Sequence, residues 1–205
     1  MTAAKDALVI GRPNVGKTLF LLNFALYCGV SSEELVLRGA AGDGAPVVPM
    51  TAAEARERLV SPHPNETRHL QSIVLELPRR KQRKKVSLWD STGLTDTIHQ
   101  APEVRLAMAE TLRALRDAQL ILHFLDAALI GEMGEKGIGA VDHQVAAYAP
   151  LRGAYVICAN KMDLPQARAG LGVIRRTFPG RRVLPVSALR GTGFREVLAF
   201  VWDHL

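Results

Sequence analysis

The chain has 205 residues, 48% of them hydrophobic, and a formal net charge of +6 at pH 7. This length supports one α/β domain with a substantial core and is short for two. No stretch reaches the roughly 18 uninterrupted apolar residues that a membrane span needs. The first ten residues predict a strand and not a signal peptide. The positive charge indicates an anionic partner but does not identify it.

Apolar runs alternate with helix-period segments along the chain. Helices between mostly apolar strands predict a parallel sheet that is covered on both faces. A short charged link separates the second and third strands, so we expect these two to pair as a hairpin. The predicted fold is therefore α/β, with a mostly parallel six-stranded sheet, one antiparallel edge strand and helices on both faces. The expected strands are 7–10, 73–77, 86–89, 120–125, 155–159 and 183–186, and the expected helices are about 17–28, 103–116, 140–148, 165–177 and 193–203.

The segment from about 29 to 70 interrupts this alternation. It begins with a Gly/Pro-rich loop and continues with a short helix that Thr51 would cap, with Glu54 at the capping-box position. A connection this long in a compact domain is typically functional or disordered. We treat residues 1–205 as a single domain with this extended insertion; a piece of a longer protein is the alternative.

The sequence GRPNVGKT at 11–18 fits the pattern GxxxxGK[ST] between a strand and a helix. Glycines let successive backbone N–H groups converge on phosphate oxygens, and the N-terminus of the helix adds its positive dipole end. Lys17 would neutralise the β and γ phosphates, and the Thr18 hydroxyl would bind Mg²⁺. A glycine-rich turn with a solvated lysine is the alternative. The predicted phosphate-binding residues are Gly11, Asn14, Val15, Gly16, Lys17, Thr18 and Leu19.

A second motif, Asn160-Lys161-Met162-Asp163, follows the expected strand 155–159 and indicates which base is bound. The Asp163 carboxylate can accept two hydrogen bonds, from guanine N1–H and from its exocyclic amine. Adenine lacks this pair, and each charged hydrogen bond is worth about 1.5–3 kcal/mol. Asn160 and Lys161 would bridge to the phosphate loop and stack along the base, and the backbone after the strand 183–186 would reach guanine O6. The predicted guanine-binding residues are Asn160, Lys161, Asp163, Ser187, Ala188 and Leu189.

The sequence Asp90-Ser-Thr-Gly93 follows the expected strand 86–89. Asp90 would bind Mg²⁺ through water, and the Gly93 N–H would contact the γ-phosphate. Each of these short motifs alone is also typical of an ordinary turn or helix cap. All of them occur at the carboxyl ends of predicted strands, where α/β folds bind ligands, and together they predict a guanine-nucleotide site.

GRPNVGKT, DSTG, NKMD and SAL resemble the P-loop GTPases, and PNVGK with an apolar residue after DxxG is similar to the Era-like group of bacterial GTPases. The resemblance covers residues 6 to 203. It implies a Ras-like fold, Mg²⁺-dependent GTP binding and hydrolysis of GTP to GDP in a molecular switch.

The resemblance also implies a switch I threonine that closes on Mg²⁺ when the γ-phosphate is present. Thr67 is the candidate because NETRH is similar to a stretch of Era-like proteins, and Thr51 is the alternative. The long segment before Thr67 departs from the family pattern. The expected metal ligands are Thr18, Thr67 and Asp90, and the expected catalytic residues are Lys17, Thr67 and Gly93.

Leu94 stands where Ras-type enzymes have a glutamine that orients the attacking water. Intrinsic hydrolysis should therefore be slow, and another source must supply positive charge. The resemblance implies that Asn14 could help to hold K⁺ beside the phosphates; local stiffening of the loop is the alternative. An activating protein or RNA is the other source. Arg68, His69 and His99 lie in or near the expected switches.

The run RRKQRKK at 79–85 holds six cations in seven residues and is expected to link the hairpin strands. It would either protect the sheet edge, bind RNA or the ribosome, or, less favourably, contact an anionic membrane. Two cysteines in apolar surroundings predict reduced thiols in a cytoplasmic protein. A GTP-regulated binding module with negligible hydrolysis is the competing function, and a nucleotide kinase is a weaker one.

Overall fold

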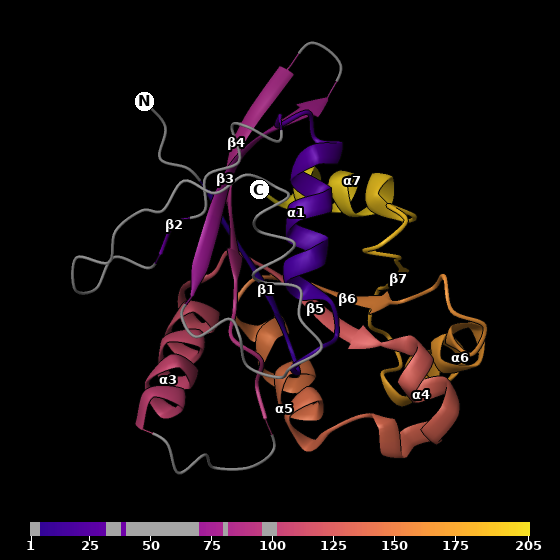
Figure 1. Ribbon diagram of the computed structural model, residues 1–205. Coiled ribbons are helices and arrows are strands. Elements are labelled where there is room, and N and C mark those ends of the chain that lie inside the picture. Colours follow the sequence, from indigo (N-terminus) through magenta and orange to yellow (C-terminus); the bar gives the residue numbers. More distant parts are fainter. Residues whose placement is uncertain (1–4, 32–37, 40–69, 80–81, 96–101) are drawn as a thin grey trace.

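Figure 1 shows the computed structural model of the protein. The structure describes residues 5–31, 38–39, 70–79, 82–95 and 102–205. Its sheet has the strand order β2-β3-β4-β1-β5-β6-β7. Strands β4, β1, β5, β6 and β7 are parallel to one another, whereas β3 pairs antiparallel with β4 and β2 with β3. The strands are β1 Lys5–Gly11, β2 Arg38–Gly39, β3 Gln71–Arg79, β4 Gln82–Asp90, β5 Leu120–Asp126, β6 Ala154–Asn160 and β7 Val183–Pro185. The predicted mostly parallel sheet and its hairpin are confirmed, and the two-residue β2 extends the sheet beyond β3.

The five predicted helices are present. The structure adds α4, which the sequence analysis missed because it is only seven residues long. Asp126 signals its start, since one carboxylate oxygen accepts the backbone N–H groups of Ala128 and Leu129. The helices are α1 Lys17–Tyr27, α3 Pro102–Asp117, α4 Ala127–Met133, α5 Ala140–Tyr148, α6 Ala167–Thr177 and α7 Phe194–His204, with 3₁₀ turns η1 Gly134–Gly137 and η2 Ala149–Leu151.

Successive side chains of β1 point to opposite faces of the sheet and show why both faces are covered by helices. Ala7 and Val9 pack with α1 and α7, whereas Leu8 and Ile10 pack with α3 and α5. Further along the sheet, α4 and α6 cover β6 through a separate apolar cluster. Because every residue of β1 from 7 to 10 is buried, both faces must be apolar, as is typical of a central parallel strand.

An aromatic cluster fixes α1 against the sheet. The Phe20 ring lies 5.0 Å from Phe24, 4.7 Å from Phe124 on β5 and 5.3 Å from Phe194 on α7, measured between centroids. Such pairs contribute about 0.5–1.5 kcal/mol each beyond the apolar area that they bury. The cluster therefore holds the helix whose N-terminus follows the glycine-rich loop.

The basic run is not the linking loop that the sequence predicted. Residues 79 and 82–85 belong to β3 and β4, and Arg79 pairs directly with Gln82 in an extended hairpin ribbon. Lys84 donates from Nζ to the Trp202 carbonyl at 2.7 Å, and its ammonium lies 4.7 Å from the Trp202 ring centroid. Side chains alternate between the two faces of this ribbon, which continues past the core with Arg83 and Lys85 exposed. The prediction that the run only links the two strands was therefore wrong for residues 79 and 82–85.

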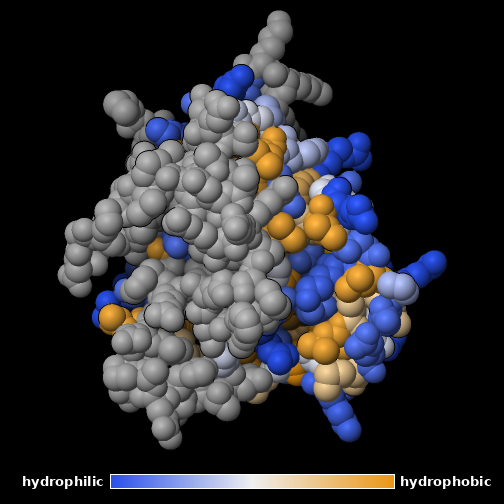
Figure 2. Space-filling model, in the orientation of Figure 1, coloured by the Kyte–Doolittle hydropathy of each residue, from blue (hydrophilic) through white to orange (hydrophobic). Residues whose placement is uncertain are grey.

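Within the described ranges, none of the helices has the length and apolar character required to cross a membrane. On the face drawn in Figure 2, hydrophobic atoms around α4 and α6 lie among hydrophilic ones. The exposed apolar residues there include Leu129, Met133 and Leu164. Apolar side chains scattered in this way are ordinary for a protein surface.

Candidate nucleotide-binding site

The loop between β1 and α1 lies at the carboxyl edge of the sheet. Its backbone takes left-handed values at Asn14 (φ 60°) and Gly16 (φ 92°). Glycine is required at position 16 for a second reason, because an added Cβ would lie 2.4 Å from the Asn160 amide nitrogen. The loop therefore combines a tight turn with close packing against a distant part of the chain, and Thr18 and Leu19 follow in the first turn of α1.

Lys17 holds a buried ammonium inside this loop. Its Nζ donates to the carbonyl oxygens of Gly11 at 3.0 Å and Arg12 at 2.8 Å, and the residue is only 6% exposed. Burial lowers the pKa of Lys17 to about 8, although the nearby carboxylates of Asp90 and Asp142 oppose this shift. A cation stripped of water and held among carbonyls is suited to an anionic ligand.

Asp90 and Thr18 meet beside this ammonium. The Thr18 hydroxyl donates to Asp90 Oδ2 at 2.6 Å, and Asp90 is fully buried. Burial raises the pKa of Asp90 to about 6, while Lys17 and the Thr18 hydrogen bond act in the opposite direction. The other carboxylate oxygen of Asp90 and the Ser91 hydroxyl are buried and have no hydrogen-bond partner in the part of the chain that the structure describes. This set of oxygen donors fits Mg²⁺, which is bound through oxygen ligands in proteins.

The stretch after β4 returns to the glycine-rich loop. Leu94 N–H donates to the Gly11 carbonyl at 3.1 Å, and the Leu94 side chain is buried. An added Cβ on Gly93 would lie 2.6 Å from the backbone nitrogen of Pro13, so the two segments are in direct contact. The Thr92 hydroxyl lies 3.0 Å from that of Thr111, which connects this stretch to α3.

Asn160 joins three segments that are far apart in the sequence. Its amide nitrogen donates to the Val15 carbonyl at 2.7 Å, and its amide oxygen accepts the Ala188 N–H at 2.9 Å. The residue is 1% exposed, so both bonds are shielded from water. The loops after β6 and β7 are thereby fixed to the glycine-rich loop, and Asn23, missed by the sequence analysis, adds a bond to the Ala188 carbonyl at 2.7 Å.

The remaining predicted base-binding residues lie around Asn160. Ser187 donates from its hydroxyl to Asp163 Oδ1 at 2.6 Å, which orients the carboxylate. Lys161 adopts a left-handed backbone (φ 66°), and its ammonium lies 2.6 Å from Asp126 Oδ2. Leu189 is 58% exposed at the edge of this group. Asp126 was not predicted as a site residue. The signal in the sequence was its position directly after an apolar strand and directly before helix-forming residues.

A buried polar chain supports the glycine-rich loop from behind. Arg12 donates to the Gly137 carbonyl at 2.9 Å and lies 3.8 Å from the buried carboxylate of Asp142. Asp142 lies 3.3 Å from His123 Nε2, and His123 Nδ1 lies 2.8 Å from the Tyr155 hydroxyl. The Arg12–Gly137 hydrogen bond spans 125 positions, and the two His123 contacts span 19 and 32, so no local pattern could have predicted them.

The expected switch residues lie outside the described part of the chain. This holds for both threonine candidates and for the nearby cation and imidazoles, namely Thr51, Thr67, Arg68, His69 and His99.

Residues 50–161, more than half of the chain, match the family model described as 50S ribosome-binding GTPase. The chain is 31% identical over 195 residues to the tRNA modification GTPase MnmE of Symbiobacterium thermophilum, a match that covers 95% of this chain and 34% of the relative. It is 34% identical over 121 residues to GTPase Obg of the same organism, covering 56% of this chain and 27% of that protein. The chain thus spans about a third of the length of these curated relatives or less.

Solved structures have the same fold. Aquifex aeolicus Era bound to GDP.AlF4- superposes with a TM-score of 0.68 at 20% identity, over 100% of this chain and 57% of that one. The G domain of the T. maritima FeoB iron transporter superposes with a TM-score of 0.56 at 13% identity, over 98% and 99%. At these identities the likeness establishes the Ras-like P-loop fold.

Proposed function

The chain belongs to the 50S ribosome-binding GTPase family, and we propose that it binds GTP with Mg²⁺, hydrolyses it slowly to GDP and acts as a molecular switch. Residues 1–205 would form one GTP-binding unit. The contacts of Asn160 carry this proposal, because one buried amide joins the base-side loops to the phosphate loop. A nucleotide would contact both sides, with its base against the loops after β6 and β7 and its polyphosphate against the glycine-rich loop.

On the base side, Asp163 would accept N1–H and the exocyclic amine of guanine. Ser187 holds one carboxylate oxygen in place, which supports a fixed orientation of the acceptor. Lys161 would lie along the base, and the backbone of Ser187, Ala188 and Leu189 would face guanine O6. A site that hydrogen-bonds a polar group rejects ligands lacking it by several orders of magnitude.

On the phosphate side, Lys17 would exchange its carbonyl partners for β and γ phosphate oxygens. Backbone N–H groups from Gly11 to Leu19 would surround the phosphates, and the Gly93 N–H would face the γ-phosphate. Thr18 and Asp90, with Thr67 proposed as the switch I ligand, would hold Mg²⁺. When bound, Mg²⁺ would neutralise charge on the β and γ phosphate oxygens.

Hydrolysis is proposed to be slow because Leu94 replaces a water-orienting side chain. It is buried, and an aliphatic group cannot hydrogen-bond to water. We propose K⁺ beside Asn14 or an activating partner as the missing positive charge. Single-turnover hydrolysis in KCl and in NaCl tests this; a rate in NaCl near the ~10⁻⁴–10⁻³ s⁻¹ of unassisted Ras and a faster one in KCl are expected. Equal rates in the two salts would exclude K⁺.

An RNA or ribosomal partner is proposed for the β3–β4 ribbon. Gln82, Arg83 and Lys85 are exposed on it, and clustered cations suit phosphates better than a neutral surface does. Replacing Arg83 and Lys85 by glutamine should reduce the salt dependence of binding to a 16S rRNA fragment by a slope of about 1–2. Lys136→Gln, on an exposed lysine of η1, is the control, and an unchanged slope in the ribbon variant would remove the ribbon from the interface.

A GTP-regulated binding module with negligible hydrolysis is the second candidate. The buried Leu94 favours it. Single-turnover assays with and without cell extract separate the two functions, because a module would show no γ-phosphate release under either condition.

A further inference from the structure

Most of the net positive charge of the chain lies near its C-terminal end. Residues 164–205 contain seven arginines, no lysine and only two acidic residues, which gives a formal charge of +5 out of the +6 of the whole chain. Four of these arginines fall in the sequence RRTFPGRR at 175–182, and all four are exposed. We call them the arginine surface, which consists of Arg175, Arg176, Arg181 and Arg182.

The turn between α6 and β7 that carries Arg181 and Arg182 is fixed by backbone hydrogen bonds. Gly180 takes a left-handed conformation (φ 76°), and the Arg181 N–H donates to the Phe178 carbonyl at 3.2 Å. The Arg182 carbonyl accepts the Ile157 N–H at 3.0 Å, which attaches the turn to β6. The other two arginines lie in the last turn of α6, directly before this segment. Because the fold sets the backbone of all four, ordering them on a ligand costs less.

The four guanidinium groups have no internal partners. None of them makes a hydrogen bond or an ion pair within the part of the chain that the structure describes. The guanidinium carbon of Arg182 lies 5.1 Å from the centre of the Phe200 ring on α7, a contact that orients the group and leaves its N–H donors available. An added anion can therefore bind these groups without first displacing another side chain.

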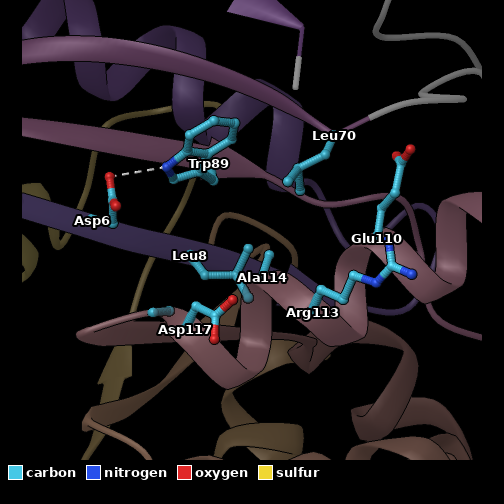
Figure 3. Close-up of a pocket in the computed structure, with 9 residues that line it drawn as sticks. Asp6, Leu8, Leu70, Trp89, Glu110, Arg113, Ala114 and Asp117 are labelled. Carbon is cyan, nitrogen blue, oxygen red and sulfur yellow. Dashed lines mark hydrogen bonds between the residues drawn. The ribbon is translucent and has the colours of Figure 1, made fainter. Parts of the chain in front are cut away.

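Asp6 and Asp117, beside the hollow between α3 and the sheet, give a contrast because both are already paired (Figure 3). The Trp89 indole N–H donates to Asp6 at 3.1 Å, and Arg116 donates to the two oxygens of Asp117 at 2.8 and 3.0 Å. A charged ligand at that position would have to compete with these bonds. The arginine surface imposes no such competition among the described residues.

We propose that the arginine surface binds the phosphate backbone of a nucleic-acid duplex. A guanidinium can donate two parallel hydrogen bonds to one phosphate, so four guanidiniums on a fixed turn suit several neighbouring phosphates. A protein partner is disfavoured because its interface would need an apolar centre, and no large hydrophobic side chain is exposed between Leu164 and Leu189, a segment that the structure describes completely. A single strand is disfavoured because its bases stack on exposed aromatic rings, whereas Phe200 is buried.

This surface is separate from the nucleotide site and from the β3–β4 ribbon. It precedes β7, whereas Ser187, Ala188 and Leu189 follow that strand. The ribbon contacts α7 through Lys84 and Trp202, and the arginine surface contacts the same helix through Phe200. Binding of a duplex here can therefore be tested independently of GTP binding and of the ribbon.

Fluorescence anisotropy of labelled RNA and DNA duplexes of about 16 base pairs tests the proposal, with the full chain and no added nucleotide. Two variants each remove two cations, Arg175→Gln with Arg176→Gln and Arg181→Gln with Arg182→Gln. Each should weaken binding about fivefold or more and reduce the slope of log affinity against log salt by about 1–2. The first variant leaves the contact with Phe200 in place, so its loss of binding cannot be attributed to that packing.

Arg116→Gln with Arg195→Gln is the matched control. It removes the same number of exposed cations, but each of them already has a carboxylate partner, Asp117 at 2.8 Å and Glu196 at 3.6 Å. Affinity for the duplex should therefore stay within about twofold of that of the parent protein.

The same losses are expected in an Arg83→Gln, Lys85→Gln background, which separates the arginine surface from the ribbon. The tighter of the two duplexes identifies the source of the phosphates. Arginine variants that bind as tightly as the control, or no saturable binding of either duplex, would overturn the proposal.

Two further probes test other occupants of the arginine surface. Binding to phosphatidylserine vesicles that exceeds binding to both duplexes, and that the arginine variants lose, would assign it to a membrane. Displacement of the duplex by poly-glutamate at an equal concentration of charge would assign it to an acidic protein. Either result would also overturn the proposal, whereas a failure to bind GTP would leave it intact.

Discussion

The base side and the phosphate side of the site differ in how well their polar groups are satisfied without ligand. Around Asn160, both ends of the buried amide are hydrogen-bonded, and the Asp163 carboxylate is oriented by Ser187. Around Asp90, a carboxylate oxygen and the Ser91 hydroxyl are buried without a partner in the described residues. The base side is therefore preorganised, whereas the phosphate side retains groups whose burial is costly until a charged ligand arrives.

The pKa shifts express the same contrast. Burial moves the pKa of Lys17 down to about 8 and that of Asp90 up to about 6. Each shift means that the folded protein disfavours the charged form of the group. Nucleotide with its metal should therefore stabilise the fold more through the phosphate side than through the base side.

Lys17→Ala should have the largest effect on binding. It removes two charge-assisted hydrogen bonds to phosphate, each worth about 1.5–3 kcal/mol, so GTP affinity should fall at least about a hundredfold. Calorimetric titration measures this. Lys136→Ala, on an exposed lysine of η1, is the control, and a Lys17→Ala protein with unchanged affinity would refute the phosphate assignment.

Asp163→Asn tests the base side. The amide no longer offers two acceptor oxygens to guanine, so GTP affinity should fall about a hundredfold while XTP is gained as a ligand. Competition between the two nucleotides measures the preference. Ser187→Ala removes only the orienting hydroxyl and should retain the preference for GTP; equal selectivity in both variants would contradict the base assignment.

Asn160→Ala should destabilise the protein even without nucleotide. It leaves the buried Val15 carbonyl and Ala188 N–H without partners, at a cost of about 2–4 kcal/mol in the free energy of unfolding. Urea denaturation measures this, and Asn23→Ala, which leaves both hydrogen bonds of Asn160 in place, should cost less. An Asn160→Ala protein as stable as the parent would show that the base side is not held by this amide.

The pH dependence of the free energy of unfolding of the nucleotide-free protein tests whether the buried charged groups of the phosphate side are costly. The folded-state pKa of Asp90, about 6, exceeds the ordinary 3.8, so its contribution to stability falls as pH rises from 4 to 6. The folded-state pKa of Lys17, about 8, lies below 10.5, so its contribution rises with pH between 8 and 10.5. The free protein should have a shallow minimum of about 1–3 kcal/mol between pH 6 and 8.

Urea denaturation across this pH range, with and without GTP and Mg²⁺, measures the minimum. The stability minimum should disappear when GTP and Mg²⁺ are bound. In the Asp90→Asn variant, the fall in stability between pH 4 and 6 should be absent. A flat profile for the nucleotide-free protein would mean that the phosphate side carries no such cost.

The sequence predicted the six longer strands and the five longer helices because buried strands and amphipathic helices impose strong periodicities. It also placed Asp90 and Asn160 at the ends of β4 and β6, Asp163 three residues later and Lys17 at the start of α1, where the structure has them, since clear apolar runs mark these strands. The seven residues of α4 are too short for a periodic signal, and only its Asp126 cap indicated it.

Other features depended on tertiary contacts that no local pattern contains. The β3–β4 ribbon extends past the core because its backbone continues to pair, and Lys84 gains a partner on α7 that is 118 positions away. The Arg12, Asp142 and His123 contacts behind the glycine-rich loop likewise join residues from three distant segments. Such contacts become visible only when the sheet brings the segments together.

Calorimetric titration of the full chain with GTP and with ATP, both with Mg²⁺, tests the central claim most directly. We expect GTP to bind at least about a hundredfold more tightly, because ATP cannot supply the two donors that the Asp163 carboxylate requires. Equal affinity for the two nucleotides, or no binding of either, would contradict the assignment of this site to guanine nucleotides.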